Sequence, residues 1–182
     1  QPDELRRAVL TASLYHDIGK AYSYYQKRAS SILDKKDETL TFRFHEILSC
    51  NILLNSHREY FSSKRRYLFK STWLINLAIH AIIHHHQGLR TLRFEHLSSD
   101  ELAQITRHDP KGTVDNINTV IGNMVGRVEE DEAIKELLIT TQRHLNEVIK
   151  QVSPETLISH YKVSERISEY CLLYTSDAAD DG

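Results

Sequence analysis

Apolar residues recur at helical spacing through most of the chain, and this periodicity constrains the fold more than any other feature. In residues 3–15, for example, Leu5, Val9, Leu10, Leu14 and Tyr15 recur at helical spacing, with polar residues between them. The 182 residues include only six Gly and three Pro, which is few for the many turns of a β-sandwich. No convincing strand, internal repeat or low-complexity tract is found. We therefore predict an all-α protein with one bundle-like domain.

The same pattern predicts the order of the helices. They are expected over residues 3–15, 21–33, 42–61, 68–86, 114–128, 131–152 and 153–170, with a short helix that begins at Ser99. Polar or basic connections are expected at 34–39, 62–66 and 89–98, and a turn cluster at 108–112. Gly88 fits the end of the 68–86 helix, and Pro154 fits the first position of the last one.

Charge, cysteine content and hydropathy exclude several classes of protein. The formal net charge is −2, so any contact with nucleic acid must come from a local basic patch. Cys50 and Cys171 are too few for a disulfide framework. The longest apolar run, 73–83, is broken by Asn76 and His80 and is too short to span a membrane. With no signal peptide visible, a cytoplasmic protein without membrane contacts is expected.

Residues suited to metal binding gather in three segments on separate predicted helices. His16 and Asp17 stand side by side, His45 follows in the 42–61 helix, and the run 84–86 is three histidines. Imidazoles and carboxylates suit a divalent cation. His80 and His84 are four residues apart, so they would share a helix face and hold a metal by themselves.

Each of these features also has a plainer interpretation. A single histidine on an amphipathic helix more often packs in the core or lies on the surface than binds a metal. Lys20 would then cap a helix end, and the basic stretch 64–66 would be a solvated loop. The histidine run would be a solvated segment, but it follows Ala81-Ile82-Ile83 inside an apolar helix, which argues against that interpretation.

The order of the motifs points to a known family. His16-Asp17-Ile18-Gly19-Lys20 resembles the signature of the HD superfamily of metal-dependent phosphohydrolases. Tyr25-Gln26, the block 43–49 and the block 81–88 narrow the likeness. Together they resemble the HD nuclease domain of the CRISPR-associated type I helicase-nuclease, and especially its stand-alone HD subunit. The resemblance covers residues 4–90 well and the later helices only in general character, and it implies an HD-domain helical bundle.

This resemblance implies roles for particular residues and two bound divalent metal ions, which would be Mn, Fe, Co, Ni or Mg. The implied metal ligands are His16, Asp17, His45, His85 and His86. Asp17 would contact both ions, and Lys20 would lie near the scissile phosphate, so these two are the implied catalytic residues. The pair of histidines in the run 84–86 can be matched in two registers, because His84 competes with His85 and His86.

Two ligands of the family have no clear match. A further histidine is expected before Gln1, and a closing aspartate is expected beyond residue 170, with Glu165 and Asp115 as weaker candidates. Residues 171–182 resemble a translated sequencing adaptor. We therefore expect an HD nuclease domain over residues 1–170 that is truncated at both ends and impaired in activity.

The main hypothesis is a metal-dependent endonuclease or exonuclease that cuts single-stranded DNA in CRISPR antiviral interference. A CRISPR helicase subunit and a surveillance complex are the implied partners. Lys64, Arg65, Arg66 and Arg90 would track the DNA backbone. One alternative is an HD nucleotide phosphohydrolase, either a deoxynucleotide triphosphatase or a cyclic-nucleotide phosphodiesterase. Another is a non-catalytic helical scaffold that binds metal structurally or not at all.

Overall fold

The computed structural model describes residues 2–32, 42–64, 67–85, 99–128, 131–153 and 155–157, and these ranges contain no strand. The prediction of an all-α fold is therefore confirmed. The elements in chain order are α1 (Pro2–Tyr15), η1 (Ile18–Ala21), α2 (Ser23–Ile32), α3 (His45–Lys64), α4 (Thr72–His84), α5 (Ser99–Arg107), α6 (Pro110–Val125) and α7 (Glu132–Lys150). Of these, η1 is a single short 3-10 helix.

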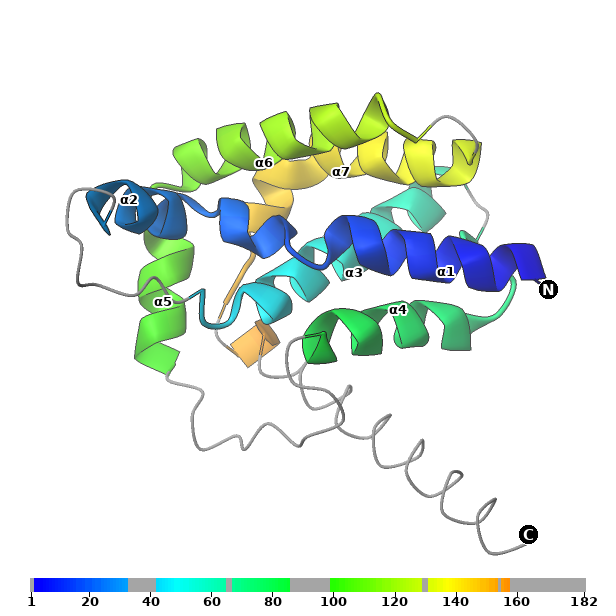
Figure 1. Ribbon diagram of the computed structural model, residues 1–182, viewed down its shortest axis with the longest axis horizontal. Helices are drawn as coiled ribbons and strands as arrows, with labels where there is room; N and C mark the ends of the chain where they lie inside the picture. Colours follow the sequence, from blue (N-terminus) through cyan, green and yellow to red (C-terminus); the bar gives the residue numbers. More distant parts are fainter. Residues whose placement is uncertain are drawn as a thin grey trace, which may run out of the picture.

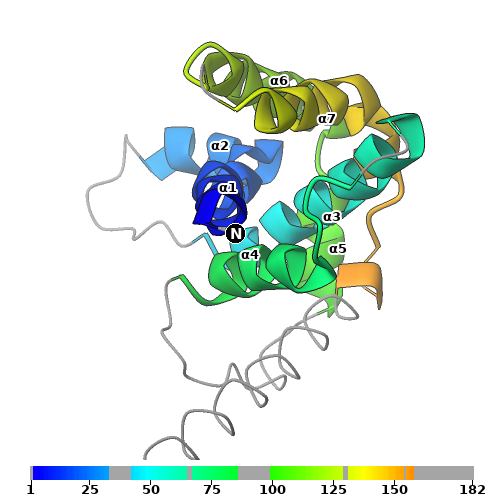
Figure 2. The ribbon, with the colours of Figure 1, turned by 90° about the vertical axis from the view of Figure 1, so that its right-hand side faces the viewer.

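The helices pack around α3. In both views, the pair α6 and α7 forms the upper side of the bundle, α4 forms the lower side, and α1 and α3 lie between them (Figures 1 and 2). Helix α3 packs against α7, α4 and η1, and α1 packs against α4. Among the described residues, no helix combines the length and the hydropathy that crossing a membrane requires.

The burial pattern of α3 explains its central place. Seven consecutive residues, 47–53, are buried, which covers nearly two turns of the helix and therefore every face of it. A helix that is buried on all sides must be enclosed by other helices. Its first residue, His45, is consequently held at a fixed position inside the bundle.

Each helix predicted up to residue 152 has a counterpart in the structure, but several boundaries differ and one group of residues was assigned wrongly. Residues 108–112 were predicted as a turn cluster, but α6 already begins at Pro110. Asp109 caps this helix by accepting a hydrogen bond from the Gly112 N–H, and proline suits the first helical position because its missing N–H is not needed there. The predicted 21–33 helix is preceded by η1, which was not expected.

Three further boundaries differ from the prediction. Helix α3 begins at His45 instead of Phe42, because Phe44 has a φ of 68° and cannot belong to a right-handed helix. The same helix continues to Lys64, so part of the predicted connection 62–66 is helical. Helix α4 begins at Thr72 instead of Leu68. The predicted connections 34–39 and 89–98, the residues 158–170 of the last predicted helix and the tail 171–182 lie outside the described residues.

Candidate metal centre

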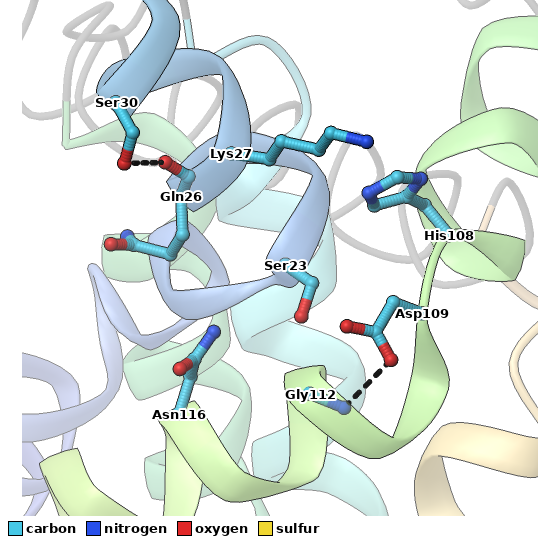
Figure 3. Close-up of a pocket in the computed structure, with 8 residues that line it drawn as sticks. All are labelled: Ser23, Gln26, Lys27, Ser30, His108, Asp109, Gly112 and Asn116. Carbon is cyan, nitrogen blue, oxygen red and sulfur yellow. Dashed lines mark hydrogen bonds between the residues drawn. The ribbon is translucent and has the colours of Figure 1, made fainter.

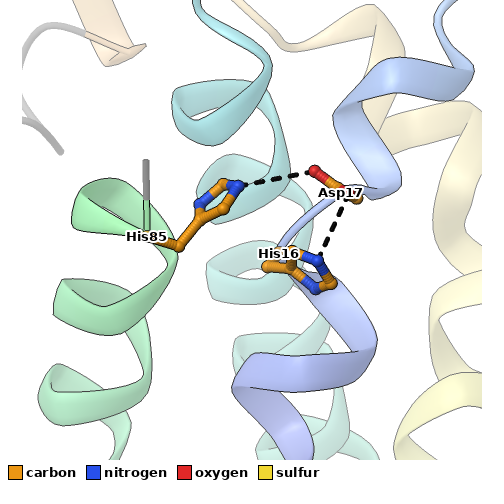
Figure 4. Close-up of side chains that lie close together, drawn as sticks. All are labelled: His16, Asp17 and His85. Atoms are coloured by element: carbon orange, nitrogen blue, oxygen red, sulfur yellow. Dashed lines mark ion pairs between the residues drawn. The ribbon is translucent and has the colours of Figure 1, made fainter. Parts of the chain in front are cut away.

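Four side chains meet where three helices end or begin. His16 and Asp17 follow the last residue of α1, His45 is the first residue of α3, and His85 follows the last residue of α4. Figure 4 shows the rings of His16 and His85 both next to the Asp17 carboxylate. The number of residues between these segments does not predict how far apart they lie in space. That distance is determined by the packing of α1 and α4 along α3.

All three imidazoles present the same nitrogen to Asp17. The Nε2 atom of His16 lies 3.3 Å from Asp17 Oδ2, and the Nε2 atoms of His45 and His85 lie 3.2 Å and 3.5 Å from Asp17 Oδ1. The Lys20 ammonium lies 2.7 Å from the same Oδ1. One carboxylate thus receives four nitrogen atoms from four side chains.

The opposite ring nitrogen of each histidine is oriented by the backbone. Nδ1 donates to the carbonyl three residues earlier: His16 to Ser13 at 2.7 Å, His45 to Phe42 at 2.5 Å and His85 to Ile82 at 2.6 Å. Because a carbonyl can only accept, the proton of a neutral ring lies on Nδ1. The lone pair of each Nε2 then faces the cluster, which is the tautomer that binds metal ions.

His45 carries a second orienting contact. Its Nδ1 also lies 3.2 Å from a carboxylate oxygen of Glu46. A carboxylate behind a ligating histidine fixes the ring and makes the ligating nitrogen more basic. Burial raises the pKa of Glu46 to about 7, so this carboxyl is only partly ionised near neutral pH.

Burial and charge set the protonation states of the cluster. Burial lowers the pKa of His45 to about 4, which keeps its ring neutral at neutral pH. For Asp17, burial acts to raise the pKa, but the hydrogen bond from Lys20 and the nearby His16, Lys20 and His45 outweigh it, so the pKa lies below its ordinary value. The carboxylate is therefore ionised and the deepest imidazole is neutral, as metal ligation requires.

The cluster has a buried base and an open side. The His45 side chain is 3% exposed, whereas those of His16 and Asp17 are each 41% exposed. The rings of His16 and His45 both approach His85 edge-on, with centroids 5.1 Å and 5.4 Å away. A ligand can therefore reach Asp17 from the exposed side, where His16 lies. His45 contacts Asp17 from the buried side of the cluster.

These residues fit a divalent transition metal. His16, Asp17 and His85 each offer a ligand atom, and the three atoms lie within 4.8 Å of one another. His45 is not one of these three residues, but its Nε2 lies 3.2 Å from the same carboxylate. Three imidazoles with one carboxylate suit Mn, Fe, Co, Ni or Zn better than Mg, which prefers oxygen ligands.

The structure places His84 and His85 in different surroundings. His85 faces Asp17, whereas the ring of His84 is buried against that of His80, with centroids 4.5 Å apart. Burial, together with the neighbouring His80, lowers the pKa of His84 to about 4. His86 lies outside the described residues, so its role as a ligand stays a prediction.

The remaining predicted site residues lie away from the cluster or outside the described part of the chain. Lys64 ends α3 and pairs with Glu136 of α7 at 2.9 Å. At a rise of ~1.5 Å per residue, it is about 28 Å along α3 from His45. Asp115 is exposed on α6 and is not in the cluster. Four predicted residues lie outside the described ranges: Arg65, Arg66, Arg90 and Glu165.

Sequence reasoning missed the residues that support the cluster. The Gly19 N–H donates to the Ser49 hydroxyl at 2.8 Å and so attaches η1 to α3. The Tyr25 hydroxyl donates to the Arg43 carbonyl, just before His45. The sequence contained one usable signal, since Tyr25 and Ser49 both lie in the motif blocks that resemble the HD nucleases.

A polar pocket of about 290 Å³ lies between α2 and the start of α6 (Figure 3). Ser23 and Lys27 line it from α2, and His108 and Asp109 line it from the other side. Gln26, also in its wall, donates its side-chain amide to the Lys20 carbonyl at 2.8 Å. The pocket shares no residue with the Asp17 cluster, and we assign it no part in the chemistry.

Comparison with family models supports the same assignment as the geometry. The model described as "HD domain" matches residues 2–151, which include all four ligand positions that meet in the structure. The match runs from the start of α1 to just past the end of α7. Comparison with curated proteins and with solved structures gave no match.

Proposed function

The chain belongs to the HD domain family, and from this membership we propose that it is a metal-dependent nuclease that cleaves single-stranded DNA in CRISPR interference. The observation that carries the hydrolytic part of this proposal is the convergence of three Nε2 atoms and the Lys20 ammonium on Asp17. Divalent ions bound there would supply Lewis-acid stabilisation of a phosphate and a water molecule of lowered pKa.

The protein's own residues then have separate tasks. Asp17, His16 and His85 would hold a metal ion at the open side of the cluster, and His45 would hold it at the buried base. The backbone carbonyls behind the three rings keep each Nε2 aimed at the carboxylate, so the ligands need little reorganisation when they bind metal. In the hydrolysis, the oxygen of water bonds to phosphorus, one ester P–O bond breaks, and a proton passes to the departing oxygen.

Lys20 is the cation that is available to the phosphate. Its ammonium contacts Asp17 and lies 5.5 Å from the centroid of the Phe42 ring, and its side chain is 28% exposed. A compact positive charge at this position stabilises the negative charge that develops on the phosphate oxygens during cleavage. This is the task that the family resemblance also implies for Lys20.

The choice of single-stranded DNA, a helicase subunit and a surveillance complex is supported by the motif blocks. The His-Asp block, the block 43–49 and the block 81–88 occur in the order found in the CRISPR-associated nuclease domain. Their described members, His16, Asp17, His45 and His85, are the side chains that meet in space.

One observation favours a second candidate, a nucleotide phosphohydrolase of the same family. Lys64, predicted to contact DNA, is paired with Glu136 at the end of α3 that lies far from His45. A deoxynucleotide triphosphate or a cyclic nucleotide would need only the cluster and Lys20, without a cationic track for a strand.

One experiment separates these candidates. The purified protein, loaded with Mn²⁺, Co²⁺ or Mg²⁺, is assayed on labelled single-stranded DNA, deoxynucleotide triphosphates, cyclic nucleotides and bis(p-nitrophenyl) phosphate. We expect strand cleavage with Mn²⁺ or Co²⁺ and none with EDTA. Hydrolysis of nucleotides with intact DNA would replace the nuclease by the second candidate, and hydrolysis of no substrate would contradict both.

Variants connect the activity to the cluster. His16→Ala and Asp17→Ala should each lower kcat/KM by more than ~100-fold, because a ligand to the metal is lost. Lys20→Ala should lower kcat by about 100-fold without preventing metal binding. His144→Ala and Lys150→Ala, both on α7, are matched controls that should leave the activity unchanged.

A further inference from the structure

We propose that Tyr25 is a positioning residue for the metal ligand His45, and that it acts by holding the turn 42–44 in a strained conformation. This inference rests on the proposed metal-dependent function, since it concerns how the same site is built. It adds a residue from α2 to a centre whose ligands come from the ends of α1, α3 and α4.

The turn before His45 has an unusual backbone. Phe44 has a φ of 68°, a conformation that bulky side chains rarely adopt because the Cβ approaches the carbonyl oxygen. Such strain persists only where surrounding contacts enforce it, and it concentrates at functional sites. Phe44 directly precedes α3, where its carbonyl accepts the Leu48 N–H at 3.1 Å, and it offers no capping side chain.

This backbone conformation orients the His45 ring towards Asp17. With Phe44 left-handed, the chain folds back so that both the backbone N–H and the Nδ1 of His45 reach the Phe42 carbonyl, at 3.3 Å and 2.5 Å. Nε2 then lies 3.2 Å from Asp17. If Phe44 relaxed to a common backbone conformation, the first turn of α3 would rotate and carry this nitrogen away from the carboxylate.

Tyr25 is the buried contact that holds the turn. Its hydroxyl donates to the Arg43 carbonyl, and its ring lies 5.5 Å from that of Phe42. Only 1% of Tyr25 is exposed. Arg43 adds a guanidinium 5.0 Å from the Phe44 ring centroid and an ion pair with Glu101 at 3.1 Å, but its side chain is 50% exposed and exposed ion pairs contribute little.

The chain offers a matched control three residues away. Tyr22 is also 1% exposed, but its hydroxyl has no hydrogen-bond partner among the described residues. Tyr25→Phe and Tyr22→Phe therefore delete the same atom from the same segment. Only the first deletion removes a bond to the turn that presents His45.

The test measures Mn²⁺ binding to metal-free protein by calorimetry, and the melting temperature in EDTA. Tyr25→Phe should weaken Mn²⁺ binding about 10-fold, as outer contacts of metal ligands do. It should also change the visible spectrum of the Co²⁺-loaded protein towards that of His45→Ala. Tyr22→Phe should leave the Mn²⁺ affinity unchanged. A purely structural Tyr25 would lower the melting temperature of Tyr25→Phe without changing either metal signal, and that result would overturn the proposal.

The possible failures are distinguishable. If the wild-type protein binds no Mn²⁺, the proposed function fails together with this inference. If it binds Mn²⁺ and folded Tyr25→Phe binds equally well, only the inference fails. Should Tyr25→Phe not fold, Phe42→Leu decides, because it removes the ring of the turn that packs against Tyr25. About threefold weaker Mn²⁺ binding by Phe42→Leu would support the proposal, and unchanged binding would overturn it.

Discussion

At the scale of single residues, Gly19 lies where η1 and α3 come closest. A Cβ atom added to Gly19 would lie 2.1 Å from the His45 carbonyl oxygen, which is well inside van der Waals contact. That carbonyl belongs to backbone and cannot move like the end of a flexible side chain. Glycine is therefore required here because another backbone approaches closely, and the neighbour is His45, the proposed metal ligand.

Gly19→Ala should destabilise the protein by roughly 2–4 kcal/mol, because η1 and the start of α3 must separate. It should also weaken Mn²⁺ binding, since His45 would move with its carbonyl. Gly122→Ala in α6 is the control. Its Cβ would meet only the end of Gln142, at 3.7 Å, so it should stabilise the helix by about 0.5–1 kcal/mol. Urea unfolding and calorimetry measure both; equal stability of the two variants would contradict the clash.

At the scale of helices, Asp131 connects two elements that are far apart in sequence. Its Oδ1 accepts from the N–H groups of Ala133 and Ile134 and so caps α7, while its Oδ2 lies 2.8 Å from Arg7 Nε on α1. The Asp131 side chain is 12% exposed, so this ion pair is better shielded from water than most surface pairs. One carboxylate thus caps the start of α7 and attaches it to α1, the helix that directly precedes His16.

Two substitutions separate these tasks. Asp131→Asn keeps a good capping side chain but removes the charge, so it should cost about 0.5–1 kcal/mol of stability. Asp131→Ala removes both contacts and should cost about 2 kcal/mol. Equilibrium unfolding in urea gives both values. Equal losses of stability in the two variants, or a larger loss in Asp131→Asn than in Asp131→Ala, would contradict this prediction.

At the scale of the whole molecule, buried titratable groups couple stability to pH. The pKa of His45 and that of His84 are both lowered to about 4, mainly by burial, from an ordinary value of 6.5. The unfolded chain therefore takes up protons on these rings below pH ~6.5, before the folded protein does. Glu46 acts in the opposite direction, because its pKa is raised by burial to about 7 from an ordinary 4.5.

Metal-free protein should consequently lose stability as the pH falls from about 6.5 to 4.5, since two histidines oppose one glutamate. Glu46→Gln removes the opposing group, so its stability should fall more steeply over the same window. Urea midpoints measured at intervals across this range test both statements. A wild-type midpoint that rises on acidification would show that another group dominates.

The sequence by itself determined which segments are helical, and which residue types carry the chemistry. Helical periodicity was sufficient for α7, because its buried apolar stripe is a local property of the chain. In α1 the same spacing located the helix but not its buried face, since Leu5 and Val9 are exposed whereas Tyr15 is buried. His16, Asp17 and His45 were likewise recognisable from motifs, since local residue order is what a motif records. Asp109 followed by Pro110 is also a recognisable helix-start pattern. The segment was nevertheless predicted as a turn, because the residues around it are typical of turns.

Only the tertiary structure decided how these residues act together. Packing against α1 and α3 fixes the rotation of α4 about its own axis. Neighbouring residues differ by about 100° around a helix, so His85 faces Asp17 while His84 points elsewhere. The left-handed Phe44 has no local sequence signal, since contacts from α2 enforce it. Lys64 looked like part of a basic track, but its charge meets Glu136 from a helix 72 positions further along the chain. Distances between helix ends depend on packing over the whole bundle, which no local pattern records.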